Sequence, residues 1–199
     1  MRTFALLFIV TVLLAGCSSP KQMIENGQWY EANNYPDKAE EYYEKALDKE
    51  PENAQLHYLL GRNKNRETNM LLIQRTQYCA LSSVDNSEVT VDRDSLLAID
   101  NRIQACHQEA IGHFLKALEF NPKLFDAHYP LAISYLETGQ YDMALYYFEQ
   151  ITRREPDNVQ AIIFLGQCHE AKGDRSKANG YYQQGVNMGS TRAQELLNG

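Results

Sequence analysis

Four copies of one short pattern recur along the chain, and this repetition limits the possible folds more than any other feature. Each copy has an alanine followed four positions later by an aromatic residue, and the four alanines are Ala39, Ala110, Ala144 and Ala178. In the first three copies a proline stands twelve positions after the alanine. Pro122 and Pro156 are 34 residues apart. A period of about 20–50 residues is typical of arrays that stack one structural unit.

The spacing within each copy predicts a helix. Ala39, Tyr43 and Ala46 recur at steps of four and three, which places them on one helical face. A second segment precedes each copy and carries a small residue at a fixed point, namely Gly27, Gly61, Ala132 or Gly166. The unit is therefore a pair of helices that the proline ends. One pair cannot bury its apolar face alone, so the pairs must stack.

This pattern resembles the tetratricopeptide repeat, in which W-x2-L-G-x2-Y is followed by A-x3-F and then P. The resemblance implies an all-α superhelix of about four helix-turn-helix repeats over residues 21–192. We place the repeats at about 20–53, 54–124, 125–158 and 159–192, and a capping helix at 190–199 with Ser190 as its N-cap.

The resemblance also implies a concave groove that is lined by the first helix of each pair and suits a peptide or a partner helix. The residues expected to point into it are Ile24, Gln28, Tyr58, Arg62, Tyr129, Ile133, Ile163 and Gln167. Tyr58, Tyr129 and Ile163 could instead pack against neighbouring helices. Neither lysine nor asparagine is among these eight residues, so we do not expect a clamp for a free C-terminal carboxylate.

The second repeat holds an insertion of about 37 residues, which we place at 65–103. Long insertions in compact domains are usually functional or disordered. The periodic apolar residues after it predict a helix from about Ser95 to Phe120, capped by Asp94 or Ser95. Two arrangements are open: the repeat's own helices extend as a straight antiparallel hairpin, or the first helix breaks at 61–69 and residues 70–81 fold back.

The N-terminus suggests an exported, lipid-anchored protein. An apolar run from Phe4 to Ala15 follows Arg2 and is shorter than the ~20 residues that span a bilayer. The sequence Leu14-Ala15-Gly16-Cys17 resembles the lipobox of bacterial lipoproteins. That resemblance implies a signal peptide at 1–16, acylation of Cys17 and a short tether at 17–20. Ser18 is not the aspartate linked to inner-membrane retention, which favours an outer membrane facing the periplasm. An ordinary signal peptide is the alternative.

Three further cysteines have different expected roles. In an oxidising compartment a disulfide between Cys79 and Cys106 is plausible. Cys168 fits a small buried thiol. Adjacent Cys-His pairs on a helix point about 100° apart and chelate poorly, so we expect no metal site and no cofactor.

Composition and motifs exclude other classes of function. The net charge of −7 argues against nucleic-acid binding, which needs clustered lysine and arginine. No motif assembles a nucleophile, a base and an orienting group, so we expect no enzyme. The leading hypothesis is a lipid-anchored adaptor that holds protein partners in the bacterial envelope. The rivals are a metal-binding or enzymatic envelope protein, and a purely structural lipoprotein. The sequence does not indicate an oligomeric state.

Overall fold

All regular structure in the described part of the chain is helical. The computed structural model describes residues 19–82 and 93–199. Its helices are α2 Pro20–Ala32, α3 Pro36–Leu47, α4 Ala54–Ser82, α5 Arg93–Phe120, the short 3-10 helix η1 Phe125–Ala127, α6 His128–Glu137, α7 Tyr141–Arg154, α8 Val159–Ala171, α9 Arg175–Asn187 and α10 Thr191–Asn198.

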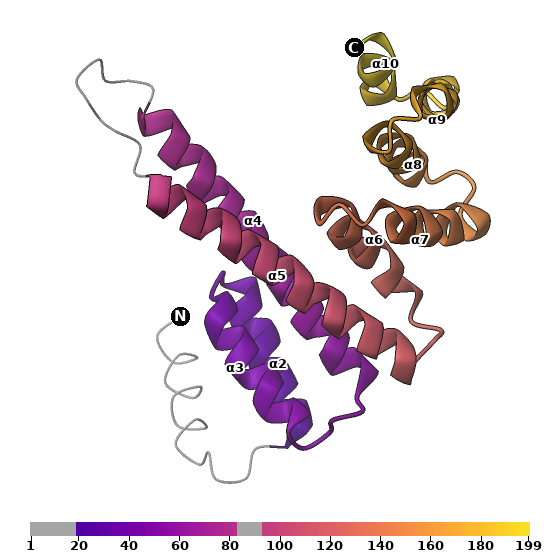
Figure 1. The fold of residues 1–199 in the computed structure, drawn as a ribbon. Coiled ribbons are helices and arrows are strands. Elements are labelled where there is room, and N and C mark those ends of the chain that lie inside the picture. Colours follow the sequence, from indigo (N-terminus) through magenta and orange to yellow (C-terminus); the bar gives the residue numbers. More distant parts are fainter. Residues whose placement is uncertain (1–18, 83–92) are drawn as a thin grey trace, which may run out of the picture.

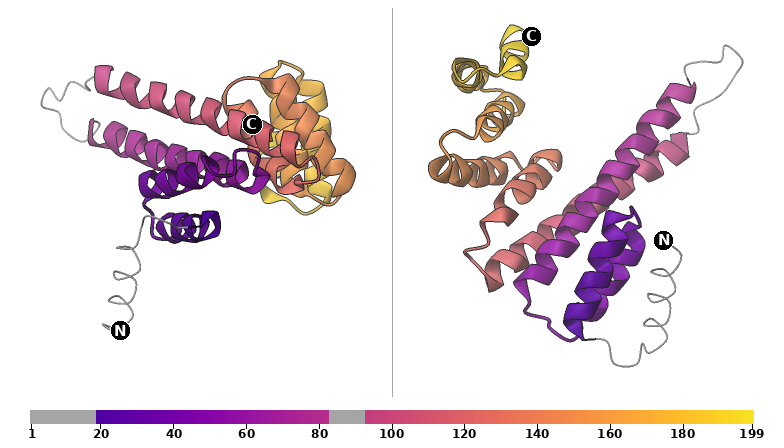
Figure 2. Two further views of the ribbon diagram at one scale, coloured as in Figure 1. Left: turned by 90° about the horizontal axis from the view of Figure 1, so that it is seen from below. Right: turned by 180° about the vertical axis from the view of Figure 1, so that it is seen from behind.

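The helices pack as consecutive antiparallel pairs: α2 with α3, α4 with α5, α6 with α7 and α8 with α9. Figure 1 shows the long α4–α5 hairpin between the first pair and the later helices. The opposite view in Figure 2 shows the same order, with α10 at the C-terminal end of the stack. The hairpin therefore belongs to the stack at its base and extends beyond it at its tip.

A glycine in the first helix of a pair lets the two helices approach each other closely. A Cβ atom on Gly27 would lie 2.4 Å from Cε1 of Tyr43, and one on Gly166 would lie 2.4 Å from Cε1 of Tyr182. Gly61 stands in the same relation to Phe114, at 2.8 Å. The repeated glycine and the repeated aromatic residue of the sequence pattern are thus one packing unit.

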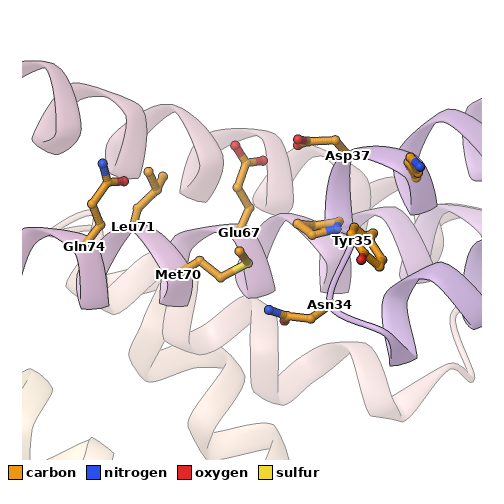
Figure 3. A pocket seen from close by; sticks show the side chains of 9 residues that line it. Asn34, Tyr35, Asp37, Glu67, Met70, Leu71 and Gln74 are labelled. Atoms are coloured by element: carbon orange, nitrogen blue, oxygen red, sulfur yellow. The ribbon is translucent and has the colours of Figure 1, made fainter.

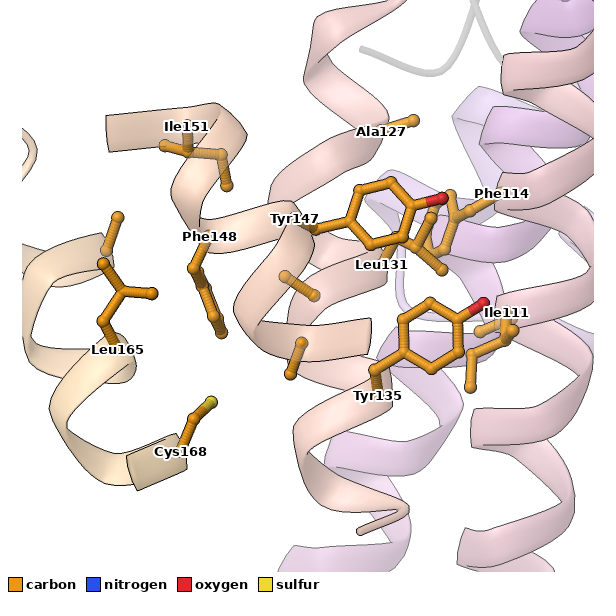
Figure 4. Packing of buried hydrophobic residues seen from close by; sticks show 14 residues of the cluster. Ile111, Phe114, Ala127, Leu131, Tyr135, Tyr147, Phe148, Ile151, Leu165 and Cys168 are labelled. Atoms are coloured by element: carbon orange, nitrogen blue, oxygen red, sulfur yellow. The ribbon is translucent and has the colours of Figure 1, made fainter. Parts of the chain in front are cut away.

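The core is divided along the stack rather than gathered at one centre. The largest cluster joins α5 to α8 and includes Phe114, Leu131, Phe148 and Leu165, all of which are buried (Figure 4). Separate buried clusters lie in the first pair with the start of α4, and in the last pair with α10. Neighbouring pairs bury each other's apolar faces, as stacked repeats require.

The turns inside the pairs use residues that tolerate a left-handed backbone. Gly139 and Gly173 have φ of 75° and 84°. In the first pair Asn34 takes this role, with φ of 66°. The predicted capping helix is present as α10. The Oγ of Ser190 accepts a hydrogen bond from the backbone N–H of Ala193 at 3.2 Å.

The insertion adopts the straight antiparallel arrangement. Helix α4 runs unbroken to Ser82, so the alternative in which it breaks at 61–69 is wrong. Helix α5 begins at Arg93, two residues before the predicted start, so Asp94 and Ser95 lie inside it rather than at its cap. An ion pair between Arg75 Nε and Asp100 Oδ1, 2.6 Å apart, joins the two arms.

This arrangement overturns the proposed Cys79–Cys106 disulfide. Cys106 lies near Glu67 on the opposite arm, and Cys79 is twelve residues further along that arm, or about 18 Å at the helical rise. A disulfide needs Cα atoms no more than about 7 Å apart. The three cysteines within residues 19–82 and 93–199 are free thiols, with Cys79 exposed and Cys106 and Cys168 buried. Burial of Cys168 was predicted and is confirmed.

The proposed signal peptide at 1–16 and the proposed lipidation site, Cys17, lie outside the described residues. Within the described ranges, none of the helices combines the length and apolar character needed to cross a bilayer.

Candidate partner-binding groove

A hollow of about 660 Å³ lies where α2, α4 and the start of α6 meet. We call it the groove hollow. It is lined by Gln28, Glu31, Ala32, Arg62, Asn65, Arg66, Asn69 and Pro130. These helices are the first members of the first three pairs, which is where the groove was predicted. Of the predicted groove residues, the structure brings Gln28 and Arg62 together here.

A buried carboxylate organises this hollow. Oε1 of Glu31 accepts a hydrogen bond from Nε of Arg62 at 3.0 Å, and Oε2 accepts one from Nη2 at 2.7 Å. Nη1 of Arg66 lies 3.7 Å from Oε1 of Glu31. The Glu31 side chain is 7% exposed, whereas those of Arg62 and Arg66 are 44% and 38% exposed. One carboxylate thus orients two guanidinium groups, and the three side chains carry a net charge of +1.

The same glutamate also holds the aromatic residue of its pair. The hydroxyl of Tyr43 donates to Oε2 of Glu31 at 2.8 Å, and burial followed by this contact raises the pKa of Tyr43. The last pair repeats the arrangement, because the hydroxyl of Tyr182 donates to Oε2 of Glu170 at 2.7 Å. In both pairs the glutamate stands four residues after the glycine. A tyrosine in the repeat is therefore matched by a glutamate.

The second pair carries Phe114 instead of a tyrosine, and Asn65 stands at the position of the glutamate. With no aromatic hydroxyl to satisfy, the Asn65 Oδ1 accepts from Oγ of Ser134 in α6 at 3.2 Å. Its side chain thereby joins α4 to α6 and lines the groove hollow. This asparagine lies at the first residue of the predicted insertion, so that segment contributes to the groove.

Sequence reasoning missed six lining residues: Glu31, Ala32, Asn65, Arg66, Asn69 and Pro130. In α4 the predicted positions were only Tyr58 and Arg62, because two positions were chosen in the first helix of each pair. Once α4 is known to continue, residues 62, 65, 66 and 69 fall on one face at helical spacing. The Gly-x3-Glu spacing common to the first and last pairs is the signal that could have identified Glu31.

The C-terminal half of the predicted groove is more closed. Ile163 is fully buried in the last core cluster, which contradicts its predicted groove position. Its side chain packs next to Gly185, where α9 and α10 cover α8. Tyr129 and Ile133 are half-buried and pack against the main cluster. Gln167 is half-buried.

The other two predicted positions lie partly in the core. Ile24 is half-buried against the first cluster, and Tyr58 is half-buried against the main cluster. The Tyr58 ring lies below the Arg62 guanidinium, with 5.9 Å between the ring centroid and Cζ. The groove therefore has a polar end at α2 and α4 and an aromatic end at α6 and α8, rather than one mixed surface.

A buried lysine ties the hairpin to the first pair beneath this groove. Nζ of Lys64 lies 2.7 Å from Oε1 of Glu40 in α3 and 2.7 Å from Oε2 of Glu109 in α5. Burial alone would lower the pKa of Lys64, but Glu109 and Glu40 raise it above its usual value. Glu67 also pairs with Arg102 across the hairpin. These ion pairs hold α3, α4 and α5 in one register.

A second hollow, of about 550 Å³, lies where the hairpin passes the α2–α3 turn. We call it the hairpin hollow. Figure 3 shows Asn34 and Tyr35 from the turn and Asp37 from the first turn of α3, together with Met70, Leu71 and Gln74 from α4. Tyr35 and Met70 are exposed, and so are Leu72, Ile73 and Leu97 further along the hairpin. The hairpin thus offers apolar surface beside the groove.

The histidines act mainly in packing. His57 is buried and stacks on Phe120 with 5.5 Å between ring centroids. His128, in the equivalent position, stacks on Phe125. Within the ranges that the structure describes, no three or more His, Cys, Asp or Glu side chains are grouped so that they could hold a metal ion.

Comparison with known proteins identifies the repeats. Three family models, each described as tetratricopeptide repeat, match residues 27–63, 113–146 and 135–197. A crystal structure of MamA superposes with a TM-score of 0.64 at 21% identity, covering 92% of this chain and 86% of that chain. The MamA RS-1 ArsTM double mutant superposes with a TM-score of 0.66 at 17% identity, covering 92% and 83%. The predicted all-α superhelix of helix pairs is thereby confirmed.

A curated protein also shares part of the sequence. A segment of 75 residues, 38% of this chain, is 31% identical to Anaphase-promoting complex subunit 3 of Schizosaccharomyces pombe (strain 972 / ATCC 24843). The chain spans 11% of that protein's length.

Proposed function

Since this chain contains tetratricopeptide repeats, we propose that it is a scaffold whose groove holds a segment of a protein partner. The observation that carries this proposal is the groove hollow, in which Glu31 orients Arg62 and Arg66 beside the side-chain amides of Gln28, Asn65 and Asn69. Guanidinium and amide groups bind backbone carbonyls and carboxylates well. The partner segment would therefore present carbonyl oxygens and an acidic side chain at the α2–α4 end.

The aromatic end of the groove suits an apolar side chain of the same segment. The Tyr129 ring lies 6.0 Å from Phe164, and Phe148 stacks on Phe164 at 5.1 Å between centroids. An extended peptide that carries an acidic residue before an apolar one would match this order of surfaces.

The test is to block the polar end of the groove without disturbing the core. Asn69 is exposed on α4 and lines the groove hollow, so Asn69→Trp should fill the hollow and abolish recovery of the partner in crosslinked pull-downs. The matched control is Gln184→Trp, at an exposed site on α9 outside the groove hollow. If Asn69→Trp leaves the recovered partners unchanged, the groove is not the binding site.

We further propose that the scaffold is held at the outer membrane of a bacterial envelope, with its repeats in the periplasm. This rests on the apolar run from Phe4 to Ala15 and the lipobox-like sequence that ends at Cys17. More than one acyl chain gives stable anchoring, whereas a single chain is marginal. Helix α2 begins at Pro20, so the first pair would lie close to the bilayer.

The anchor has its own test. Cys17→Ala should release the protein from membranes into the soluble fraction, because the acylated sulfur and the processed amino group are both lost. Continued tight association of this variant with membranes would contradict lipidation and would leave the groove proposal unaffected.

A further inference from the structure

A third hollow, of about 580 Å³, lies on another part of the surface, between the loop after α5, the start of α6 and the last turn of α7. We call it the basic hollow. Its charged lining residues are Lys123, Arg153 and Arg154, and none of the residues that line it is acidic. The chain as a whole has a net charge of −7, whereas the charged side chains that line this hollow are all positive.

The cations of the basic hollow are less neutralised than those of the groove hollow. Arg153 pairs with Glu149 of its own helix, with 3.2 Å between Nη2 and Oε2. Lys123 and Arg154 form no ion pair with any residue in the described ranges. Counting Glu149, the site carries a net charge of +2. Arginines in the last turn of α7 also suit the helix dipole, but that does not explain Lys123, which comes from a separate loop.

Aromatic contacts hold the central arginine in place. Cζ of Arg154 lies 4.1 Å from the centroid of the Phe125 ring. The His128 ring stacks on the same phenylalanine, with 4.8 Å between the ring centroids. His128 is itself fixed, because its Nδ1 lies 3.1 Å from the backbone oxygen of Phe125. A stacked guanidinium keeps its N–H groups available at its edge, where it can bind a planar or tetrahedral oxyanion in a bidentate manner.

The loop that carries Lys123 is also ordered by its own contacts. The backbone N–H of Lys123 donates to the side-chain Oδ1 of Asn121 at 3.1 Å, and the backbone N–H of Leu124 donates to the backbone oxygen of Asn121 at 3.0 Å. Two elements thus present cations to one space from fixed backbones. This arrangement costs less entropy on binding than lysines on a mobile loop would.

We propose that the basic hollow binds a phosphate monoester group, which carries a charge of about −1.5 to −2 at neutral pH. This charge matches the net charge of the site, whereas a single carboxylate would leave half of it unbalanced. The group could belong to a soluble phosphate ester or to the headgroup of phosphatidic acid. The proposal goes beyond the scaffold function, since the site is formed by η1, α6 and α7 outside the groove hollow.

The test is calorimetric titration of the full chain with glycerol 3-phosphate, together with sedimentation on vesicles of phosphatidylcholine with and without phosphatidic acid. The double variant Lys123→Gln/Arg154→Gln should weaken phosphate binding about tenfold or more, because each lost contact is a charge-assisted hydrogen bond. Arg154→Lys keeps the charge but loses the planar fork, and should give an intermediate loss.

The matched control is Lys45→Gln/Lys172→Gln, which removes two cations that are already paired with Glu41 and Asp142 elsewhere on the surface. It should change phosphate binding less than about twofold. Saturable binding of glycerol 3-phosphate assigns the site to soluble esters, and binding confined to phosphatidic acid vesicles assigns it to a lipid headgroup. No binding of either probe, or equal losses in the two double variants with both still folded by circular dichroism, would overturn the proposal.

Discussion

At the scale of the residue, the glycine in the first helix of a pair exists to admit the aromatic ring of the second helix. A Cβ on Gly166 would lie 2.4 Å from the Tyr182 ring, closer than side chains can pack. Gly180, in the same pair, has no heavy atom within 4 Å of the corresponding position. The two glycines therefore provide a matched comparison.

We expect Gly166→Ala to lower the free energy of unfolding by about 1–3 kcal/mol, since the ring or the helices must shift. Gly180→Ala should raise it by up to about 1 kcal/mol, because alanine favours an exposed helical position. Urea denaturation of both variants checks this. Equal effects of the two substitutions would show that the close approach of the helices does not determine stability.

The pairing of tyrosine with glutamate gives a second residue-scale prediction. The third pair combines Phe148 with Leu136, whereas the fourth combines Tyr182 with Glu170, whose Oε2 accepts a hydrogen bond from the tyrosine hydroxyl. Tyr182→Phe alone should cost about 1 kcal/mol, because that hydrogen bond is lost. Tyr182→Phe/Glu170→Leu, which copies the third pair, should cost less than the sum of the single changes.

The measurement is a double-mutant cycle by denaturation, with a coupling of about 0.5–1.5 kcal/mol expected. Strictly additive costs would mean that the two side chains do not act together in the folded protein.

At the scale of the element, α4 and α5 meet through two imidazoles at their base. Nδ1 of His57 lies 3.3 Å from Nδ1 of His113, and Nε2 of His57 lies 3.1 Å from the backbone oxygen of Pro51. The surrounding charged groups are Lys64, Glu109, Lys116 and Glu119. Burial, followed by the neighbouring His57, lowers the pKa of His113 to about 4, and burial also lowers the pKa of His57.

The sign of the resulting pH effect follows from proton binding. Between the ordinary histidine pKa of 6.5 and about 4, the unfolded chain binds protons that the folded His113 excludes. The free energy of unfolding should therefore fall as the pH falls through this window. His113→Leu should lose less stability than the wild type between pH 7 and pH 4 in denaturation measured at each pH. An equal loss in both proteins would contradict the role of this pair.

The hairpin is the other element whose role can be measured. Because Lys64, Glu67 and Arg102 form ion pairs at its base, a shortened protein should keep them. Replacing residues 72–100 by a short glycine-containing turn should leave a cooperative melting transition and an intact groove. If the exposed apolar surface of the hairpin selects partners, this variant should recover fewer partners in crosslinked pull-downs. An unchanged set of partners would show that the hairpin does not determine which partners are bound.

At the scale of the whole molecule, the helix pairs could be predicted because each depends on nearby residues. The spacing of Ala39 and Tyr43, and of Gly166 and Tyr182, reports contacts within one pair. The path of the insertion was less predictable, since a polar run such as 61–69 is compatible with a break and with an exposed helical face. Only the packing of α4 against α3, α5 and α6 selects the unbroken helix.

The groove was predicted only in part for the same reason. Gln28 and Arg62 follow from position within the repeat, but Asn65 and Asn69 enter only when α4 continues past Arg62. Ile163 occupies an equivalent sequence position and is nevertheless buried, because it packs in one cluster with Ala178, Tyr182 and Ala193 of α9 and α10. Equivalent positions in a stack differ in exposure according to their neighbours.

Site-specific photo-crosslinking shows directly whether a partner segment lies in the groove. A photoreactive residue is placed at Asn69, in the groove hollow, and in a separate protein at Gln184, on the exposed face of α9. We expect the probe at Asn69 to capture one segment of a partner that contains an acidic residue, and the probe at Gln184 not to capture it. Capture of the same segment only from Gln184, or equally from both sites, would contradict binding in the groove.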